Sequence, residues 1–118
     1  MVPYYFQFSD LYTAPDSPPL NVTVIPLSYT SVRVKWDKVP ETKRNGIITD
    51  YTIGLFNSSL SWNITVYGED NLTVVIEGLE MFVTYKVRAL ASTTAGSGDF
   101  SSPVNATTNQ TSKLARIN

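Results

Sequence analysis

Apolar and polar residues alternate with a period of two along most of the chain, from Leu20 to Ala106. This alternation is typical of half-buried β-strands, because successive side chains of a strand point to opposite faces of its sheet. No segment has a helical period, and turn-forming residues separate the alternating segments, as at residues 40–46 and 68–71. The pattern predicts seven short strands and therefore an all-β sandwich.

The apolar positions of these strands predict which side chains face the core. Strand by strand, the inward set is Leu20, Val22 and Val24; Val32, Val34 and Trp36; Ile47, Tyr51, Ile53 and Leu55; Leu60, Trp62, Ile64 and Val66; Leu72, Val74 and Ile76; Tyr85, Val87, Ala89 and Ala91; and, in a last strand, Val104 and Ala106. Trp36 is expected to be a core residue rather than a ligand contact. The parity of Trp62 favours core packing, but its strand is expected near a sheet edge, where exposure would make it a contact candidate.

Length, charge and composition limit the classes of function. The chain has 118 residues, enough for one domain that buries about two thirds of its unfolded surface. Its formal net charge is −1 and its cations are scattered, which resembles neither a nucleic-acid footprint nor a basic membrane patch. It has no Cys and no His, which excludes the usual zinc sites, thiol nucleophiles and His-based acid–base pairs. We therefore expect no enzyme activity, no cofactor, no nucleic-acid partner and, without a run of about 18 apolar residues, no direct membrane insertion.

Residues from about 18 to 108 resemble a fibronectin type III domain from end to end. The motifs that carry the resemblance are, in chain order, Pro18-Pro19, Ser31-Val32-Arg33-Val34-Lys35-Trp36, Gly46-Ile47-Ile48-Thr49-Asp50-Tyr51, Leu79 with Tyr85, and Ala91 followed by Gly96, Gly98 and Ser101. Two positions depart from the family: Met81 stands where it often has Pro, and Ala89 where it prefers Val. The resemblance implies a seven-stranded immunoglobulin-like β-sandwich. It also implies a structural core that includes Trp36, Tyr51, Leu79 and Tyr85, with the Tyr85 hydroxyl bonded to backbone near Leu79.

The amino-acid sequence is similar to that of repeats in animal cell-surface proteins, such as receptor-type tyrosine phosphatases and adhesion molecules of the sidekick kind. The segment that begins Phe8-Ser9 echoes the one that begins Phe100-Ser101, an offset of 92 residues that is close to one sandwich repeat. This favours a linker at residues 1–17 with the last strand of a preceding repeat at 4–13, the domain at 18–108, and a tail or linker at 109–118. Neighbouring repeats of the same chain are then expected partners. The alternative is chance, since Phe-Ser is a common dipeptide.

Six Asn-x-Ser/Thr sequences are candidate N-glycosylation sites, at Asn21, Asn57, Asn63, Asn71, Asn105 and Asn109. The composition predicts about two such sequences by chance. Alternation offers a second explanation, because an outward strand face rich in Asn and Thr repeats every second residue. Together with the family resemblance, the excess favours an extracellular location in a cell-surface or secreted protein.

The loop before the last strand corresponds to the one that carries Arg-Gly-Asp in integrin-binding members of the family. Here Ser97-Gly98-Asp99 lacks the arginine, so integrin binding through this loop is not expected. The loop remains a candidate contact surface through Thr93, Thr94, Gly96, Ser97, Gly98 and Asp99. Five cations are solvated charges or, alternatively, a basic surface for heparin-like polysaccharide: Lys38, Lys43, Arg44, Lys86 and Arg88.

These features favour a non-catalytic extracellular module that acts as a spacer and protein-contact surface in a cell-adhesion or receptor ectodomain, with partners that the sequence does not name. One alternative is a ligand-binding domain of a cytokine-receptor-like protein. Such a domain would have disulfide cysteines or a Trp-Ser-x-Trp-Ser box, where this chain has Gly98-Asp99-Phe100-Ser101-Ser102. The other alternative is an accessory sandwich of a secreted enzyme, against which the excess of glycosylation sequences argues.

Overall fold

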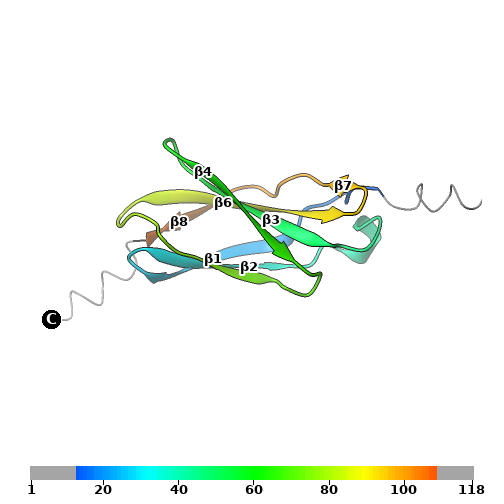
Figure 1. The fold of residues 1–118 in the computed structure, drawn as a ribbon, viewed down its shortest axis with the longest axis horizontal. Helices are drawn as coiled ribbons and strands as arrows, with labels where there is room; N and C mark the ends of the chain where they lie inside the picture. The colour runs from blue at the N-terminus through cyan, green and yellow to red at the C-terminus, as the bar shows by residue number, and fades with distance from the viewer. Residues whose placement is uncertain (1–12, 109–118) are drawn as a thin grey trace, which may run out of the picture.

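The computed structural model describes residues 13–108, which form a two-layer antiparallel β-sandwich. The smaller sheet has the order β1-β2-β5, with β1 at Leu20–Ser28, β2 at Ser31–Asp37 and β5 at Thr73–Ile76. The larger sheet has the order β4-β3-β6-β7, with β8 also paired to β6; its strands are Asp50–Phe56 (β3), Ser61–Tyr67 (β4), Thr84–Thr93 (β6), Gly96–Ser97 (β7) and Val104–Thr107 (β8). Figure 1 shows the two layers packed face to face, with β1 and β2 in one and β3, β4 and β6 in the other. The all-β sandwich predicted from the period-two pattern is confirmed.

The last predicted strand, around Val104 and Ala106, is present as β8, and the loop predicted before it contains a further short strand, β7. β7 follows the end of β6 through a tight turn, and β8 pairs with the beginning of β6. Between them the chain leaves the regular ladder, but Gly98 N–H still donates to Ala91 O and Ser101 N–H to Ala89 O. Among residues 13–108, the one helical element is a 3₁₀ turn at Glu41–Lys43 (η1), within the loop that joins β2 to β3.

The core lies between the sheets and consists of the alternating apolar positions of both. Its buried members are Val32, Val34, Trp36, Val39, Ile48, Tyr51, Ile53, Leu55, Ile76, Leu79, Tyr85, Val87, Ala89, Ala91 and Ala106. Trp36 of β2 packs against Tyr51 of β3 with ring centroids 5.5 Å apart and planes at 60°. This contact joins the two layers near the end of β2 and the beginning of β3, in the tilted geometry that aromatic pairs prefer.

Three side chains expected to face the core are exposed instead. Leu20 is 41% exposed, because a register shift between Leu20 and Thr23 places it opposite the exposed Asp37. Ile47 is 65% exposed, and its neighbour Ile48 is buried in its place. The reason is that β3 begins only at Asp50, so the strand parity does not extend back to Ile47. Trp62 has the inward parity but is 38% exposed, because β4 is the outer strand of the larger sheet and the smaller sheet has three strands to cover it.

A tyrosine corner closes the connection between β5 and β6. Tyr85 is buried, and its hydroxyl oxygen accepts a hydrogen bond from Glu80 N–H at 2.9 Å. The preceding residue, Leu79, is also buried, and its N–H donates to Thr30 O in the β1–β2 turn at 2.9 Å. The connection is thereby bonded to a strand of one sheet and to a turn of the other.

Replacing Tyr85 by Phe tests how much this corner stabilises the fold. The variant leaves Glu80 N–H without its acceptor, so we expect the free energy of unfolding to fall by about 1–2 kcal/mol. Urea denaturation measures the change, and Tyr67→Phe is the matched control because Tyr67 is 72% exposed. A Tyr85→Phe variant as stable as this control would contradict the role given to the hydroxyl.

Candidate contact surfaces

The segment that leads into β1 is fastened to the loops at one end of the sandwich. Thr13 N–H donates to Asn45 O at 3.0 Å, and Asn45 Nδ2 donates back to Ala14 O at 3.0 Å. Asp16 N–H donates to Lys43 O at 2.8 Å, and Thr93 Oγ1 donates to Thr13 O at 2.8 Å. Residues 13–16, the entry segment, therefore bridge the β2–β3 loop and the end of β6.

Gly98 is the residue that lets the entry segment approach so closely. A Cβ at this position would lie 2.7 Å from the carbonyl oxygen of Pro15 and 3.3 Å from its Cβ. Since real Cβ atoms are essentially never that close to a backbone oxygen, any other residue would force the two segments apart. Pro15 itself is buried by this contact.

The entry segment covers part of the predicted contact loop. Thr93 is buried, and its hydroxyl accepts from Ala95 N–H as well as donating to Thr13 O. Thr94, Ser97 and Asp99 are exposed, whereas Gly96 and Gly98 are half-buried. Of the six loop residues, three therefore present side chains to a partner. No sequence pattern signalled the entry segment, because its own backbone groups make the hydrogen bonds and their partners lie far along the chain.

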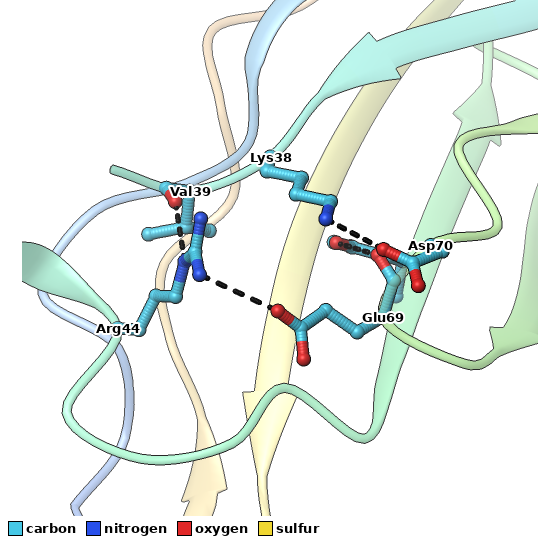
Figure 2. A network of polar contacts seen from close by, with 6 residues as sticks. Lys38, Val39, Arg44, Glu69 and Asp70 are labelled. Carbon is cyan, nitrogen blue, oxygen red and sulfur yellow. Dashed lines mark hydrogen bonds and ion pairs between the residues drawn. The ribbon is translucent and has the colours of Figure 1, made fainter. Parts of the chain in front are cut away.

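Ion pairs join the β2–β3 loop to the β4–β5 turn at the same end (Figure 2). Lys38 pairs with Asp70, and Arg44 Nη1 lies 3.3 Å from Glu69 Oε2. Arg44 Nε also donates to Val39 O at 2.7 Å, which fixes the guanidinium in the loop. The hydrogen bond from Lys38, with its positive charge, lowers the pKa of the exposed Asp70 carboxyl below its ordinary value.

Tyr51 supports this turn from within the core. Its hydroxyl donates to Glu69 O at 2.7 Å, so the turn is bonded to β3. Burial, followed by the negative charge of Glu69, raises the pKa of Tyr51 from 10.0 to about 12. The neutral phenol is therefore the form that the fold requires.

Four of the five cations proposed as a basic surface have side-chain partners, and these lie in two separate places; the fifth, Lys43, is exposed in η1. Lys38 and Arg44 are in the ion pairs of the β4–β5 turn. Lys86 Nζ donates to Asn105 Oδ1 at 3.1 Å, and Arg88 stacks on two aromatic rings, both on the outer face of the larger sheet. The structure does not bring these charges together into one patch.

The four most exposed large apolar side chains of the described residues lie at the two ends of the sandwich. Ile47 and Tyr67, the latter 72% exposed, lie at the end that holds the entry segment, because Tyr67 pairs with Asp50 and Asp50 with Ser92. At the other end, Met81 is 54% and Phe82 60% exposed. Phe82 stacks on Tyr29 at 5.9 Å and has a φ of 59°, which is unusual for a bulky residue.

The candidate glycosylation sites differ in the hydrogen bonds that their side-chain amides make. Asn21 and Asn71 donate from Nδ2, to Asp37 Oδ2 and to Tyr67 O respectively. Asn57 uses Oδ1 to accept from Ser59 N–H and Leu60 N–H in the β3–β4 turn, and Asn105 uses Oδ1 to accept from Lys86. Asn63 is exposed in the middle of β4. Asn109 lies outside the described residues.

An aromatic and cationic stack on the outer face of the larger sheet was not anticipated from the sequence. The Arg88 guanidinium carbon lies 4.9 Å from the ring centroid of Phe56 and 4.1 Å from that of Phe100. The available signal was Phe56, a large apolar residue at an outward position next to the inward Leu55. Such a position favours a surface contact rather than core packing.

Neither a metal centre nor a membrane span is built from residues 13–108. Their Asp and Glu side chains form no group of three that would hold a metal ion. Within the same residues, no helix has the length and apolar character needed to cross a bilayer. The geometry instead defines a two-layer sandwich whose chemistry is that of loops and strand faces.

The fold and its surface define an immunoglobulin-like β-sandwich module with a tyrosine corner. The profile of the fibronectin type III domain matches residues 17–107, and the chain belongs to this family. The resemblance seen in the sequence motifs is thereby confirmed.

Relatives of the chain are large cell-surface proteins. It is 36% identical over 96 residues to protein sidekick-1 of Gallus gallus, and the aligned region covers 78% of this chain and 4% of the relative. It is 38% identical over 94 residues to Roundabout homolog 2 of Homo sapiens, with 76% of this chain and 7% of the relative covered. Receptor-type tyrosine-protein phosphatase F of Danio rerio is 33% identical over 102 residues, which is 83% of this chain and 5% of the relative. The chain thus corresponds to a small part of each, and its domain is of the kind found in adhesion and receptor proteins.

Solved structures agree with the fold. The third fibronectin III domain of the human KIAA0343 protein superimposes with a TM-score of 0.72 at 25% identity, covering 80% of this chain and 82% of that domain. The FN1–FN3 domains of chicken CNTN1 give a TM-score of 0.69 at 23% identity, with 79% of this chain and 32% of that chain covered. The latter likeness concerns the fold alone.

Replacing Gly98 by Ala tests whether close packing holds the entry segment in place. The new Cβ would meet Pro15 O at 2.7 Å, so we expect the segment to detach and the free energy of unfolding to fall by about 1–3 kcal/mol. Hydrogen exchange at Thr13 N–H and Asp16 N–H should become much faster in the variant. Thr94→Ala is the control on the same exposed loop, and unchanged exchange in Gly98→Ala would show that the segment tolerates the added methyl group.

Alkaline pH should selectively weaken the Tyr51 contact. The folded pKa of about 12 lies above the ordinary 10.0, so the contribution of the neutral phenol is complete below pH 10 and is lost as pH rises from 10 towards 12. The stability difference between the parent and Tyr51→Phe should therefore shrink over this range, as measured by urea denaturation at each pH. The paired comparison cancels the titration of other groups. A difference that stays constant from pH 9 to about 12 would contradict the raised pKa.

Proposed function

We propose that the chain is a non-catalytic extracellular module that acts as a spacer and protein-contact surface in a cell-adhesion or receptor ectodomain. Membership of the fibronectin type III family and the adhesion and receptor relatives support this proposal. The observation that carries it is the way in which the chain is fastened where it enters and where it leaves the sandwich.

The two fastenings lie at opposite ends. The entry segment is bonded to the β2–β3 loop and to β6, as described above. At the exit, Thr108 is fully buried, its hydroxyl donates to Glu80 O at 2.8 Å, and it accepts from Val83 N–H at 3.4 Å. In Figure 1 the entry lies beside β7 and the exit beyond β8, at the far end of the layers. A module held in this way transmits a fixed distance and direction between whatever is attached to its ends.

The extracellular location rests on the glycosylation sequences and the family. Five of the six sequences fall within the described residues, and Asn21, Asn63, Asn71 and Asn105 are exposed. Glycans at Asn21, Asn63 and Asn105 would cover the outer faces of both sheets, because these residues lie on β1, β4 and β8. Asn71 lies instead in the β4–β5 turn, beside Tyr67. Contact with a protein partner would then be concentrated at the ends of the sandwich.

The end that holds the entry segment offers such a contact surface. Ile47 and Tyr67 are large, exposed and apolar, and Tyr67 lies in the same row of the larger sheet as Ser92 and Ser97. Thr94, Ser97 and Asp99 add hydrogen-bonding groups from the predicted contact loop. An apolar centre with a polar border is the usual composition of a protein interface.

The domain boundaries form part of the proposal. We place the module at residues 18–108, with residues 1–17 as a linker that includes the last strand of a preceding repeat and 109–118 as a tail or linker. The predicted strand at residues 4–13 falls outside the described residues except for Thr13. The chain spans 4–7% of the relatives compared above, so neighbouring repeats of the same chain are the partners that the spacer role requires.

A distance measurement across the sandwich tests the spacer role. The chain has no Cys, so Asp16→Cys with Glu80→Cys places a spin label at each end without interference. If the entry segment is fastened, the distribution of label-to-label distances should be as narrow as that of Lys43→Cys with Glu80→Cys, the control whose labels both lie on the sandwich itself. A distribution several times broader for the Asp16 pair would mean that the entry is loose, and the proposed spacer function would fail.

A further inference from the structure

The outer face of the larger sheet carries one row of residues that brings a glycosylation sequence next to an aromatic stack. Asn63 of β4 pairs with Gly54 of β3, and Gly54 pairs with Arg88 of β6. Residues paired in this way point to the same face of a sheet. The middle member has no side chain, so Asn63 and Arg88 face each other across the backbone of Gly54.

Phe100 fills the space above Gly54. A Cβ at position 54 would lie 3.5 Å from Phe100 Cε1, 3.5 Å from Arg88 Cγ and 3.2 Å from Asn63 Oδ1. The ring edge, the arginine stem and the asparagine amide therefore surround one point. The Asn63 amide, whose Oδ1 faces this point, therefore lies on the same side of the sheet as the edge of the Phe100 ring.

The stack itself is a partly open surface. The Arg88 guanidinium lies between the rings of Phe56 and Phe100, at 4.9 and 4.1 Å from their centroids. Both rings and Arg88 are half-buried. Arg88 Nε is itself buried and has no hydrogen-bond partner among the described residues, so the terminal Nη atoms are the guanidinium donors that a ligand on this face could use. The surface offers aromatic faces and guanidinium donors in one place, which suits a ligand with both C–H groups and oxygen acceptors.

We propose that an N-linked glycan on Asn63 folds back onto the Phe56–Arg88–Phe100 stack. The weakly positive C–H hydrogens of the first sugar pack on the negative face of an aromatic ring, and sugar oxygens accept hydrogen bonds from Arg88. This inference rests on the proposed extracellular function, because the sugar is added only in the secretory pathway.

Asn63 is the site that suits this arrangement. Its Nδ2, the atom that carries the sugar, has no hydrogen-bond partner within residues 13–108, whereas Nδ2 of Asn21 and of Asn71 is already a donor. Asn105 lies on the same face, but it pairs with Lys86, which pairs in turn with Phe56, so the lysine separates it from the stack. The Asn63 glycan would have no such group in its path.

The test is a double-mutant cycle on the full chain secreted from mammalian cells. Thr65→Ala removes the glycosylation sequence but keeps Asn63, and Phe100→Leu removes the ring but keeps an apolar side chain of similar size. Glycopeptide mass spectrometry measures occupancy at Asn63, and thermal unfolding measures the melting temperature. We expect Thr65→Ala to lower the melting temperature by about 4 °C in the parent and to have almost no effect when Phe100 is Leu.

Two controls make the result specific. The same four proteins produced in bacteria lack the glycan and should show no coupling between the two positions. Phe82→Leu removes an exposed ring at the far end of the sandwich and should leave the effect of Thr65→Ala unchanged.

Three results of these experiments would overturn the inference. An unoccupied Asn63 in the secreted chain would overturn the inference and remove a support of the proposed extracellular function. Full occupancy with an equal effect of Thr65→Ala in the parent and in Phe100→Leu would overturn the inference alone. Coupling that also occurs in the bacterial proteins, or with Phe82→Leu, would also overturn it, because the effect would not arise from contact between the glycan and the stack.

Discussion

Two buried tyrosine hydroxyls hold the chain at the places where it crosses between the sheets. Tyr51 and Tyr85 both belong to the larger sheet, on β3 and β6, yet each bonds to backbone beside β5 of the smaller sheet. Tyr51 donates to Glu69 O before β5, and Tyr85 accepts from Glu80 N–H after it. β5 has four residues and pairs with β2 alone. Its position therefore depends on the two tyrosine hydrogen bonds that hold the connections before and after it.

This arrangement reconciles two demands on a sandwich core. A crossing connection has backbone polar groups that lose water when the layers close, and a buried polar group without a partner costs about 1–3 kcal/mol. A tyrosine fills apolar volume with its ring and supplies the partner with its hydroxyl, so one side chain meets both demands. The raised pKa of Tyr51 is a consequence of the same burial. Trp36 completes the core by packing on Tyr51 from the opposite layer.

The sequence predicts the parts of this structure that depend on local periodicity. The alternating positions from Val32 to Trp36 and from Tyr51 to Leu55 are buried as expected, because regular strands there have a continuous partner on both sides. Ile47 departs because the ladder has not yet begun, and Trp62 because β4 is an outer strand. Parity fixes the face of a sheet to which a side chain points, and the neighbouring elements decide whether that face is covered.

The candidate sites also divide into features with a local sequence signal and features that depend on tertiary contacts. Asn-x-Ser/Thr motifs can be found in the sequence because the signal is local, whereas the partners that distinguish Asn63 from Asn21 come from other strands. The entry segment and the stack on Arg88 depend on glycine positions, Gly98 and Gly54, where a missing Cβ permits contact between segments far apart in the chain. A glycine in a strand or loop pattern indicates that some segment approaches closely, but only the tertiary structure identifies which one.

The distribution of these features over the surface explains how one small sandwich can separate its tasks. Strand faces are wide and flat, and here they carry the exposed Asn21, Asn63 and Asn105 and the stack on Arg88. The ends hold the fastened entry and exit and the most exposed apolar side chains, Ile47 and Tyr67 at one and Phe82 at the other. In the proposed function, bulky and hydrated glycans on the strand faces would leave the ends as the surfaces where apolar burial can drive association. In the proposed array the ends would also be where neighbouring modules meet, so a partner bound at the contact loop would be sensitive to how the entry segment is held.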